Sequence, residues 1–217
     1  MVFRLIRFAL LAAALLAGAP ARAETAGDFD FYVLSLSWSP SFCEGREGNR
    51  ESLQCGSARP FAFIVHGLWP QYERGYPDFC PTREPREVPR REIDRVLDIM
   101  PSRSLVRHEW EKHGTCSGLR QRSYFNLTRQ ARERITIPPE FVRLDDYKVT
   151  SPRAVEAAFI AANPGLRPDG IAVTCGDRRL SEVRICLTRD LAFRACREVD
   201  RNACRAAEVV MPPVRSR

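Results

Sequence analysis

The stretch Phe31-Tyr32-Val33-Leu34-Ser35-Leu36-Ser37-Trp38 alternates large apolar side chains with others along its length, and Pro40 follows two residues later. A period of two is typical of a β-strand, and proline cannot donate a ladder hydrogen bond, so it favours the end of such a strand. The sequence therefore predicts a strand over residues 31–38.

A second strand is predicted at Phe61–His66, which is apolar on both faces. Such a run suits a central strand that is buried on both sides. Gly67 follows directly. We therefore expect His66 to lie where this strand stops.

The rest of the chain alternates helical and extended patterns. Helices are predicted over Pro89–Met100 and Tyr124–Ile135, and another begins with Ser151 as its cap and Pro152 at its first position. Later strands are predicted at Ile171–Cys175, Leu180–Leu187 and Glu208–Met211. This mixture predicts an α+β domain with an antiparallel β-sheet core that is packed by several helices.

The N-terminal residues predict export. Arg4 and Arg7 precede an apolar run from Phe8 to Ala17, and the small-residue triplet Ala21-Arg22-Ala23 follows. This order is typical of a secretory signal peptide over residues 1–23, cleaved after Ala23. A membrane anchor is the alternative, but a run of roughly 10 residues is short for a span that needs about 20.

Residues 24–217 are expected to form a single domain with its own hydrophobic core. The net charge of +7 includes three arginines of the signal peptide, so removing it leaves +4. A mild positive charge is compatible with a polyanionic partner but does not establish one. We expect a periplasmic or secreted monomer with no membrane attachment after cleavage.

The cysteine count predicts disulfides. All eight cysteines follow residue 23, and an even number in an exported chain indicates four bridges. They are Cys43, Cys55, Cys80, Cys116, Cys175, Cys186, Cys196 and Cys204. Zinc is the alternative, but no pair has the short gap of a zinc knuckle. Eight cysteines allow 105 pairings, so spacing leaves the connectivity open.

Two of the three histidines of the chain lie in the segment Leu105–His113. At about 100° per residue, a helix here would turn Val106 and Trp110 to the core. Four polar residues would share one face: His108, Glu109, Lys112 and His113.

Two other interpretations of this face are open. It could be a solvated helix surface whose charged neighbours pair only by their spacing. It could also bind zinc, but a zinc helix needs histidines four residues apart, whereas His108 and His113 are five apart.

Two histidines, a lysine and a carboxylate can catalyse phosphoryl transfer without a metal. RNA carries its own nucleophile, the 2′-hydroxyl. One imidazole can take that proton while the other protonates the departing 5′-oxygen, because the ordinary pKa of histidine suits both tasks. A lysine can stabilise the charge on the phosphorane oxygens.

Two long motifs carry a resemblance to a known family. The segments Phe63–Pro70 (FIVHGLWP) and His108–Cys116 (HEWEKHGTC) resemble the two active-site segments of the ribonuclease T2 family. The likeness includes Phe31–Trp38 and covers most of residues 28–212. It implies an α+β fold and cleavage of single-stranded RNA with little base preference, through a 2′,3′-cyclic phosphate that is hydrolysed more slowly.

The resemblance also implies roles for individual residues. By position, His113 is similar to the general base of the first step and His66 to the general acid. Lys112 and Glu109 resemble the pair that stabilises the pentacovalent phosphate. No metal and no cofactor are implied.

Two further residues are expected to bind substrate. His108 resembles the residue that holds the phosphate in the ground state, and Trp69 would offer its indole face to a base. The alternative for Trp69 is a buried ring that fills the core. The resemblance implies the bridges Cys43–Cys55, Cys80–Cys116, Cys175–Cys204 and, nested within the last, Cys186–Cys196.

Two rival functions remain on the sequence alone. The first is a secreted RNA-binding protein without activity, which a missing catalytic histidine would favour, and none is missing. The second is a toxin-like effector in which the same nuclease acts on foreign RNA after delivery. Nutrient scavenging, RNA turnover and defence also fit the same residues equally well.

Overall fold

A computed structural model describes residues 25–45, 48, 52–56, 58 and 60–215. The predicted signal peptide over residues 1–23 lies outside the described residues. Within the described ranges, no helix combines the length and apolar character needed to span a bilayer.

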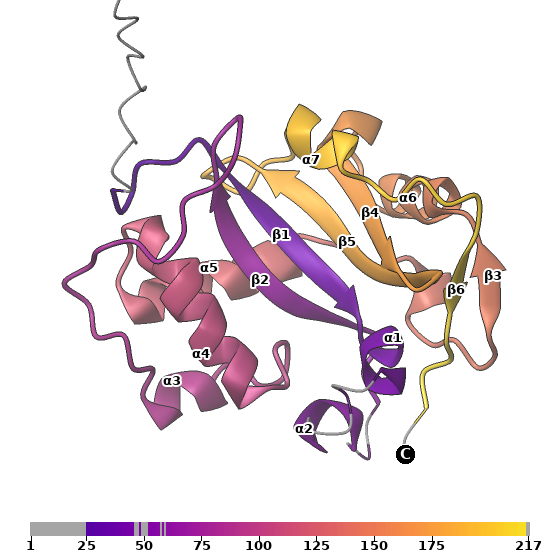
Figure 1. Ribbon diagram of the computed structural model, residues 1–217, viewed down its shortest axis with the longest axis horizontal. Helices are drawn as coiled ribbons and strands as arrows, with labels where there is room; N and C mark the ends of the chain where they lie inside the picture. Colours follow the sequence, from indigo (N-terminus) through magenta and orange to yellow (C-terminus); the bar gives the residue numbers. More distant parts are fainter. Residues whose placement is uncertain (1–24, 46–47, 49–51, 57, 59, 216–217) are drawn as a thin grey trace, which may run out of the picture.

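A mixed sheet forms the centre of the fold (Figure 1). Within the described residues its strands are β1 (Phe31–Trp38), β2 (Phe63–Gln71), β3 (Lys148–Thr150), β4 (Ile171–Gly176), β5 (Arg179–Leu187) and β6 (Val209–Met211). Their order is β2-β1-β5-β6-β3, and β4 pairs with β5 outside this path.

The sheet confirms the predicted α+β class, with one difference. β1 pairs antiparallel with β2 and β5, and β4 pairs antiparallel with β5. β6, however, pairs parallel to β5 at Arg179 and Val210. After β5 the chain returns through α7 (Arg197–Arg201) before β6 begins, so the two strands run in the same direction.

β2 differs from the prediction because it continues to Gln71 instead of stopping at His66. The strand keeps its hydrogen-bonded partner β1 on both sides of Gly67. Glycine weakens a strand interior, but pairing on both sides overrides this preference. His66 therefore lies inside a strand.

Helices surround the sheet on one side and at its ends (Figure 1). The remaining α-helices of the described residues are α1 (Ser39–Glu44), α2 (Ser52–Cys55), α3 (Arg90–Asp94), α4 (Arg103–Lys112), α5 (Gln121–Glu133) and α6 (Pro152–Ala162). The cap predicted for α6 is confirmed, since the Ser151 side chain accepts a hydrogen bond from the Ala154 amide.

α3 is shorter than the helix predicted over Pro89–Met100. It ends at Asp94, and tight turns follow. The carbonyl of Ile99 accepts a hydrogen bond from the Val65 amide at 2.8 Å. This bond ties the segment to the outer edge of β2. Within this segment, the amides of Val96 and Ile99 donate to carbonyls three residues earlier, so tight turns replace the predicted last turns of the helix.

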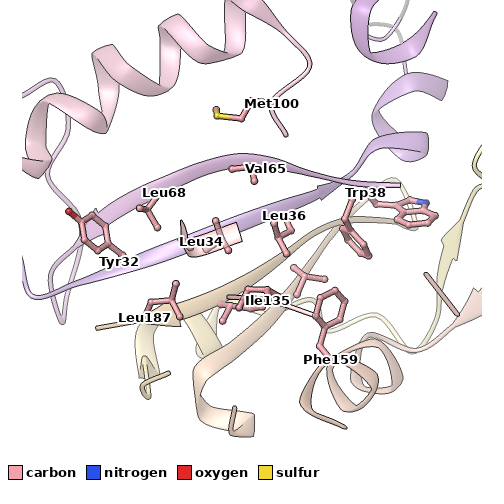
Figure 2. Packing of buried hydrophobic residues seen from close by; sticks show 14 of the residues in the cluster. Tyr32, Leu34, Leu36, Trp38, Val65, Leu68, Met100, Ile135, Phe159 and Leu187 are labelled. Atoms are coloured by element: carbon pink, nitrogen blue, oxygen red, sulfur yellow. The ribbon is translucent and has the colours of Figure 1, made fainter. Parts of the chain in front are cut away.

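One face of the sheet holds the main hydrophobic core (Figure 2). Every second residue of β1 points into it, which confirms the alternation: Tyr32, Leu34, Leu36 and Trp38 are all buried. Tyr124 of α5 and Phe159 of α6 close the core from the helical side.

The opposite face is mixed in character. Phe31 and Val33 form a small apolar cluster with Cys186 and Cys196 at one end. Further along β1 the same face carries Ser35 and Ser37. Polar side chains of the neighbouring strands gather above these small residues.

Four disulfides hold the loops, as the cysteine count predicted. All four implied pairings are confirmed: Cys43–Cys55, Cys80–Cys116, Cys175–Cys204 and Cys186–Cys196. No described cysteine is free, so the zinc alternative for the cysteines is wrong.

Candidate active site

A β-bulge presents His66 at the polar face. Gly67 pairs with Ser35 and Val65 pairs with Leu36, so His66 is the extra residue between them. A bulge bends a strand and re-aims the side chain of the added residue. The His66 ring, about one third exposed, reaches Glu182 through Nδ1, while Nε2 lies 3.5 Å from Oε1 of Glu109.

The helix α4 brings the second group of polar residues. Ser102 caps its first turn by accepting a hydrogen bond from the Leu105 amide. Val106 and Trp110 are fully buried, as the helical periodicity predicted. Glu109 is also buried, with only 1% of its surface exposed, whereas His108 stays exposed.

His113 lies one residue beyond α4, at its C-terminal cap. The predicted helix over Leu105–His113 is therefore one residue too long at this end. The His113 amide still donates to the carbonyl of Glu109, and the ring is buried. Its Nδ1 is buried and has no hydrogen-bond partner among the described residues.

Gly67 allows α4 to approach the sheet closely. A Cβ at this position would lie 1.9 Å from Oε2 of Glu109 and 2.3 Å from Nε1 of Trp69. These two atoms form a hydrogen bond of 2.7 Å directly above the glycine. Any side chain at position 67 would displace this bond.

The Cys80–Cys116 bridge joins the loop after β2 to the short 3-10 helix (Gly114–Ser117) that follows α4. The Phe79 amide donates to the carbonyl of Lys112 at 2.8 Å, which fixes the same junction. Tyr76, on this loop, is half exposed, and its ring centroid lies 6.2 Å from that of His113. The bridge thus connects the two predicted active-site segments.

The polar residues line two adjoining hollows. One, of about 350 Å³, is lined by all six predicted site residues, His66, Trp69, His108, Glu109, Lys112 and His113. The other, of about 1050 Å³, extends along Ser37, Ser104 and Arg179. His66, His108 and Glu182 line both, so they stand at the junction of one long depression.

His66 and His113 are electrostatically different. Burial, together with the positive charges of Lys112, His108 and His66, lowers the pKa of His113 to about 3. Burial also disfavours a charged His66, but its hydrogen bond to Glu182 and the nearby carboxylates outweigh this effect and raise its pKa. At neutral pH, His113 is therefore neutral, and His66 favours its protonated form.

Glu109 is protonated more readily than an ordinary carboxyl group. Burial raises its pKa to about 7, against the opposing effects of His66, the Trp69 hydrogen bond and Lys112. The Oε2 atom of this carboxyl group accepts a hydrogen bond from the Trp69 indole N–H, and Oε1 faces His66. In its protonated form, the Glu109 carboxyl group can therefore face an anionic ligand without charge repulsion.

Trp69 combines features of both interpretations. Its ring is partly exposed and packs against the small apolar cluster around Phe31. The Arg184 guanidinium lies over it at 5.1 Å, and the His113 ring is 5.3 Å away. Its indole N–H positions Glu109 as well.

Sequence reasoning missed three residues at the site. Glu182 and Arg184 come from β5, and Tyr76 comes from the loop after β2. The signal for the first two was two charges at alternate positions in a strand that is otherwise mostly apolar. The described residues contain no group of three or more His, Cys, Asp or Glu arranged to hold a metal ion.

Comparison with known proteins supports the same family as the motifs. The model of the Ribonuclease T2 family matches residues 29–196. A ribonuclease of Aeromonas hydrophila is 50% identical over 109 residues, which cover 50% of this chain and 47% of that protein. Ribonuclease I of Escherichia coli is 28% identical over 211 residues, covering 78% of this chain and 79% of the relative.

The first of these matches is partial: the chain spans about half the length of the curated relatives from Aeromonas hydrophila and Haemophilus influenzae.

Solved structures share the fold. An RNase-related protein from Calystegia sepium has a TM-score of 0.68 at 22% identity, covering 86% of this chain and 98% of that one. RNase NT in complex with 5′-AMP has a TM-score of 0.59 at 20% identity, covering 86% and 99%. Because the family model matches more than half of the sequence, this chain belongs to the ribonuclease T2 family.

Proposed function

We propose that this protein is a metal-independent endoribonuclease that cleaves single-stranded RNA by transphosphorylation. The observation that carries the proposal is the pairing of His66 and His113 in one pocket with pKa shifts of opposite direction. An acid and a base that are both ready at the same pH are what the reaction requires.

In the first step, His113 acts as the general base. Its buried Nδ1 has no acceptor among the described residues, so nothing stabilises a charged ring before substrate binds. The neutral imidazole takes the proton of the 2′-hydroxyl, and the 2′-oxygen forms a bond to phosphorus. The incoming phosphate then stabilises the protonated ring.

His66 acts as the general acid in the same step. The bond between phosphorus and the 5′-oxygen breaks, and His66 gives its Nε2 proton to that oxygen. The product is a 2′,3′-cyclic phosphate. In the second step the roles reverse: water adds to phosphorus, His66 takes its proton, and His113 returns a proton to the 2′-oxygen, which leaves a 3′-phosphate.

Lys112 and Glu109 stabilise the phosphorane. Lys112 lies in the same pocket and contributes a positive charge to the equatorial oxygens. Glu109, whose pKa is raised to about 7, donates a hydrogen bond as a neutral acid instead of repelling the phosphate. A buried carboxyl group can act this way only if burial keeps it protonated.

Substrate binding is assigned to residues around the pocket. His108 is exposed at the junction of the two hollows, where it can contact the phosphate in the ground state. A base can stack against Trp69, although Arg184 covers part of its ring. Tyr76, half exposed beside His113, offers a second ring.

We also propose that the protein is exported and acts as a monomer. Four disulfides are typical of proteins from oxidising compartments such as the periplasm or the extracellular space. The predicted signal peptide supports the same route.

The proposal is tested by incubating the purified protein with the four RNA homopolymers in excess chelator. We expect all four to be cut, with 2′,3′-cyclic ends that later become 3′-phosphates. Binding of the homopolymers without cleavage would favour the RNA-binding alternative. Cleavage that stops in chelator and returns with a divalent ion would contradict the metal-independent mechanism.

A further inference from the structure

A pair of charged residues on β5 lies across the sheet from His66. In the sheet order β2-β1-β5, the strand of His66 and the strand of Glu182 are separated by β1. Two strand spacings amount to roughly 10 Å, yet the two side chains meet. The contact bridges over the intervening strand.

Serines on β1 leave room for this bridge. Glu182 pairs with Ser37 and Arg184 pairs with Ser35, and paired residues share a face of the sheet. Each serine rises little above the backbone, so the long side chains of β5 can extend over β1. The bulge brings His66 toward them from the other side.

Glu182 is held in one orientation. Its Oε2 accepts two hydrogen bonds from Arg184, at 2.9 Å from Nε and 2.7 Å from Nη2, and its Oε1 accepts the bond from His66. The carboxyl group is largely buried, and burial favours its neutral form. The charges and hydrogen bonds of His66 and Arg184 prevail, and they lower the pKa of Glu182 to about 2.

Building on the function proposed above, we propose that Glu182 is a positioning residue. It accepts a hydrogen bond from the Nδ1–H group of His66 and thereby directs Nε2 toward the scissile phosphate. Arg184 in turn fixes the orientation of Glu182. The mechanism already described does not use either residue.

The bond assigns each proton of the His66 ring. In the charged ring, the Nδ1 proton stays on the ring and is hydrogen-bonded to Glu182, and the Nε2 proton goes to the departing 5′-oxygen. The neutral ring that remains is then held with its proton on Nδ1. Its Nε2 lone pair is free to take the proton of water in the second step, so one hydrogen bond serves both half-reactions.

Glu182→Gln tests the proposal because the shape of the side chain is kept and its charge is lost. A glutamine has one oxygen, which can accept from His66 or from Arg184 but cannot replace both carboxylate oxygens. The pKa of His66 should therefore fall. Glu156→Gln on α6 is the matched control, since Glu156 accepts a hydrogen bond from Val173 and has no contact with the pocket.

The first measurement is the pKa of His66 by NMR, which requires no activity. The chain has only three histidines, so His66→Ala identifies the resonance. We expect Glu182→Gln to lower the pKa of His66 by about one pH unit or more, which is the scale on which a neighbouring charge acts. Glu156→Gln should leave it unchanged.

The second measurement is the pH dependence of cleavage of a ribodinucleotide. The basic limb of kcat/KM should move to lower pH in Glu182→Gln. On that limb, kcat/KM should fall about tenfold for each pH unit by which the pKa of His66 decreases. KM should change much less than kcat. Thermal unfolding of both variants serves as the control that they are folded.

The outcomes separate this inference from the proposed function. Lower kcat with an unmoved basic limb and an unchanged pKa of His66 would mean that Glu182 only supports the structure, and would overturn the inference. If the wild-type protein fails to cleave RNA, the proposed function fails, while the NMR titration still decides whether Glu182 controls the charge of His66.

Discussion

The two faces of the β2–β1–β5 sheet differ, although the same strands form both. The core face follows strict alternation and carries apolar residues such as Leu34, Leu36 and Ile185. The opposite face carries Ser35 and Gly67 side by side, with Arg184 beside them. Small residues there create a depression, and long polar side chains enter it from β5 and α4.

Under the proposed function, stability and chemistry are separated between the two faces of one sheet. Burial of the apolar residues of the core face excludes water and contributes to the free energy of folding. On the polar face, buried charges are kept only because each has a partner, such as Glu182 with Arg184. Mutations on the two faces should therefore change different measurements.

The largest effect is expected at the two histidines of the polar face. His66→Ala and His113→Ala should each lower kcat by more than about two orders of magnitude, the usual scale for losing a positioned acid or base. Thermal unfolding should still be cooperative. Near-normal turnover in a folded variant would show that the acid or base is assigned to the wrong residue.

A paired substitution compares the two faces directly. Leu36→Ala should destabilise the protein by about 2–5 kcal/mol while leaving the activity of the remaining folded protein close to normal. Gly67→Ala should lower kcat by at least about tenfold, because a misplaced catalytic group costs one to two orders of magnitude. Its Cβ would lie 1.9 Å from Oε2 of Glu109.

Gly176→Ala is the control for the glycine, since its Cβ would meet only Ser181 at an ordinary 3.6 Å. Denaturant unfolding and single-turnover cleavage measure the two effects. If Gly67→Ala retains full turnover, the close approach of α4 to the sheet is not required for catalysis.

The disulfides give a second contrast. Replacing either Cys80 and Cys116 or Cys43 and Cys55 by alanine should cost about 2–4 kcal/mol of stability. Only the first pair joins the two predicted active-site segments, so only its loss should also lower the activity of the folded protein. Equal activity in both double variants would contradict this role of the bridge.

Much of this arrangement was predictable from sequence, for identifiable reasons. Strand β1 and the buried side of α4 follow from periodicity within single segments. Trp38 is the last of the apolar residues that lie at every second position of β1, and Trp110 lies four residues after Val106 on the buried side of α4. The bridges followed from the resemblance, and the proposed catalytic pair rests on it. These features depend on local pattern or on long motifs.

What was missed depends on pairing between distant strands. The bulge at His66 exists only in the register of β2 against β1, and no local pattern in β2 specifies it. Glu182 lies 116 residues from His66 in sequence, so their hydrogen bond required the complete sheet order. The segment after α3 likewise bonds to a distant strand, through the carbonyl of Ile99 and the amide of Val65 in β2.

The pH profile should reflect the opposite shifts of the two histidines. Activity is lost at low pH when His113, whose pKa is lowered to about 3, becomes protonated. It is lost at high pH when His66, whose pKa is raised, becomes neutral and when Glu109, whose pKa is raised to about 7, ionises and no longer donates to the phosphate. We therefore expect kcat/KM to be flat through mildly acidic pH and to fall only beyond these limits. A sharp acidic limb that His113→Ala leaves in place would assign the base elsewhere.

The proposed mechanism requires the polar face to move protons while the substrate supplies the nucleophile. The decisive test is a DNA oligonucleotide with a single ribose, incubated with the protein in excess chelator. We predict one cut, immediately 3′ of that ribose, with a 2′,3′-cyclic phosphate that precedes the 3′-monophosphate. Efficient cleavage of the all-deoxy strand, or activity that chelator abolishes and a divalent ion restores, would contradict this mechanism.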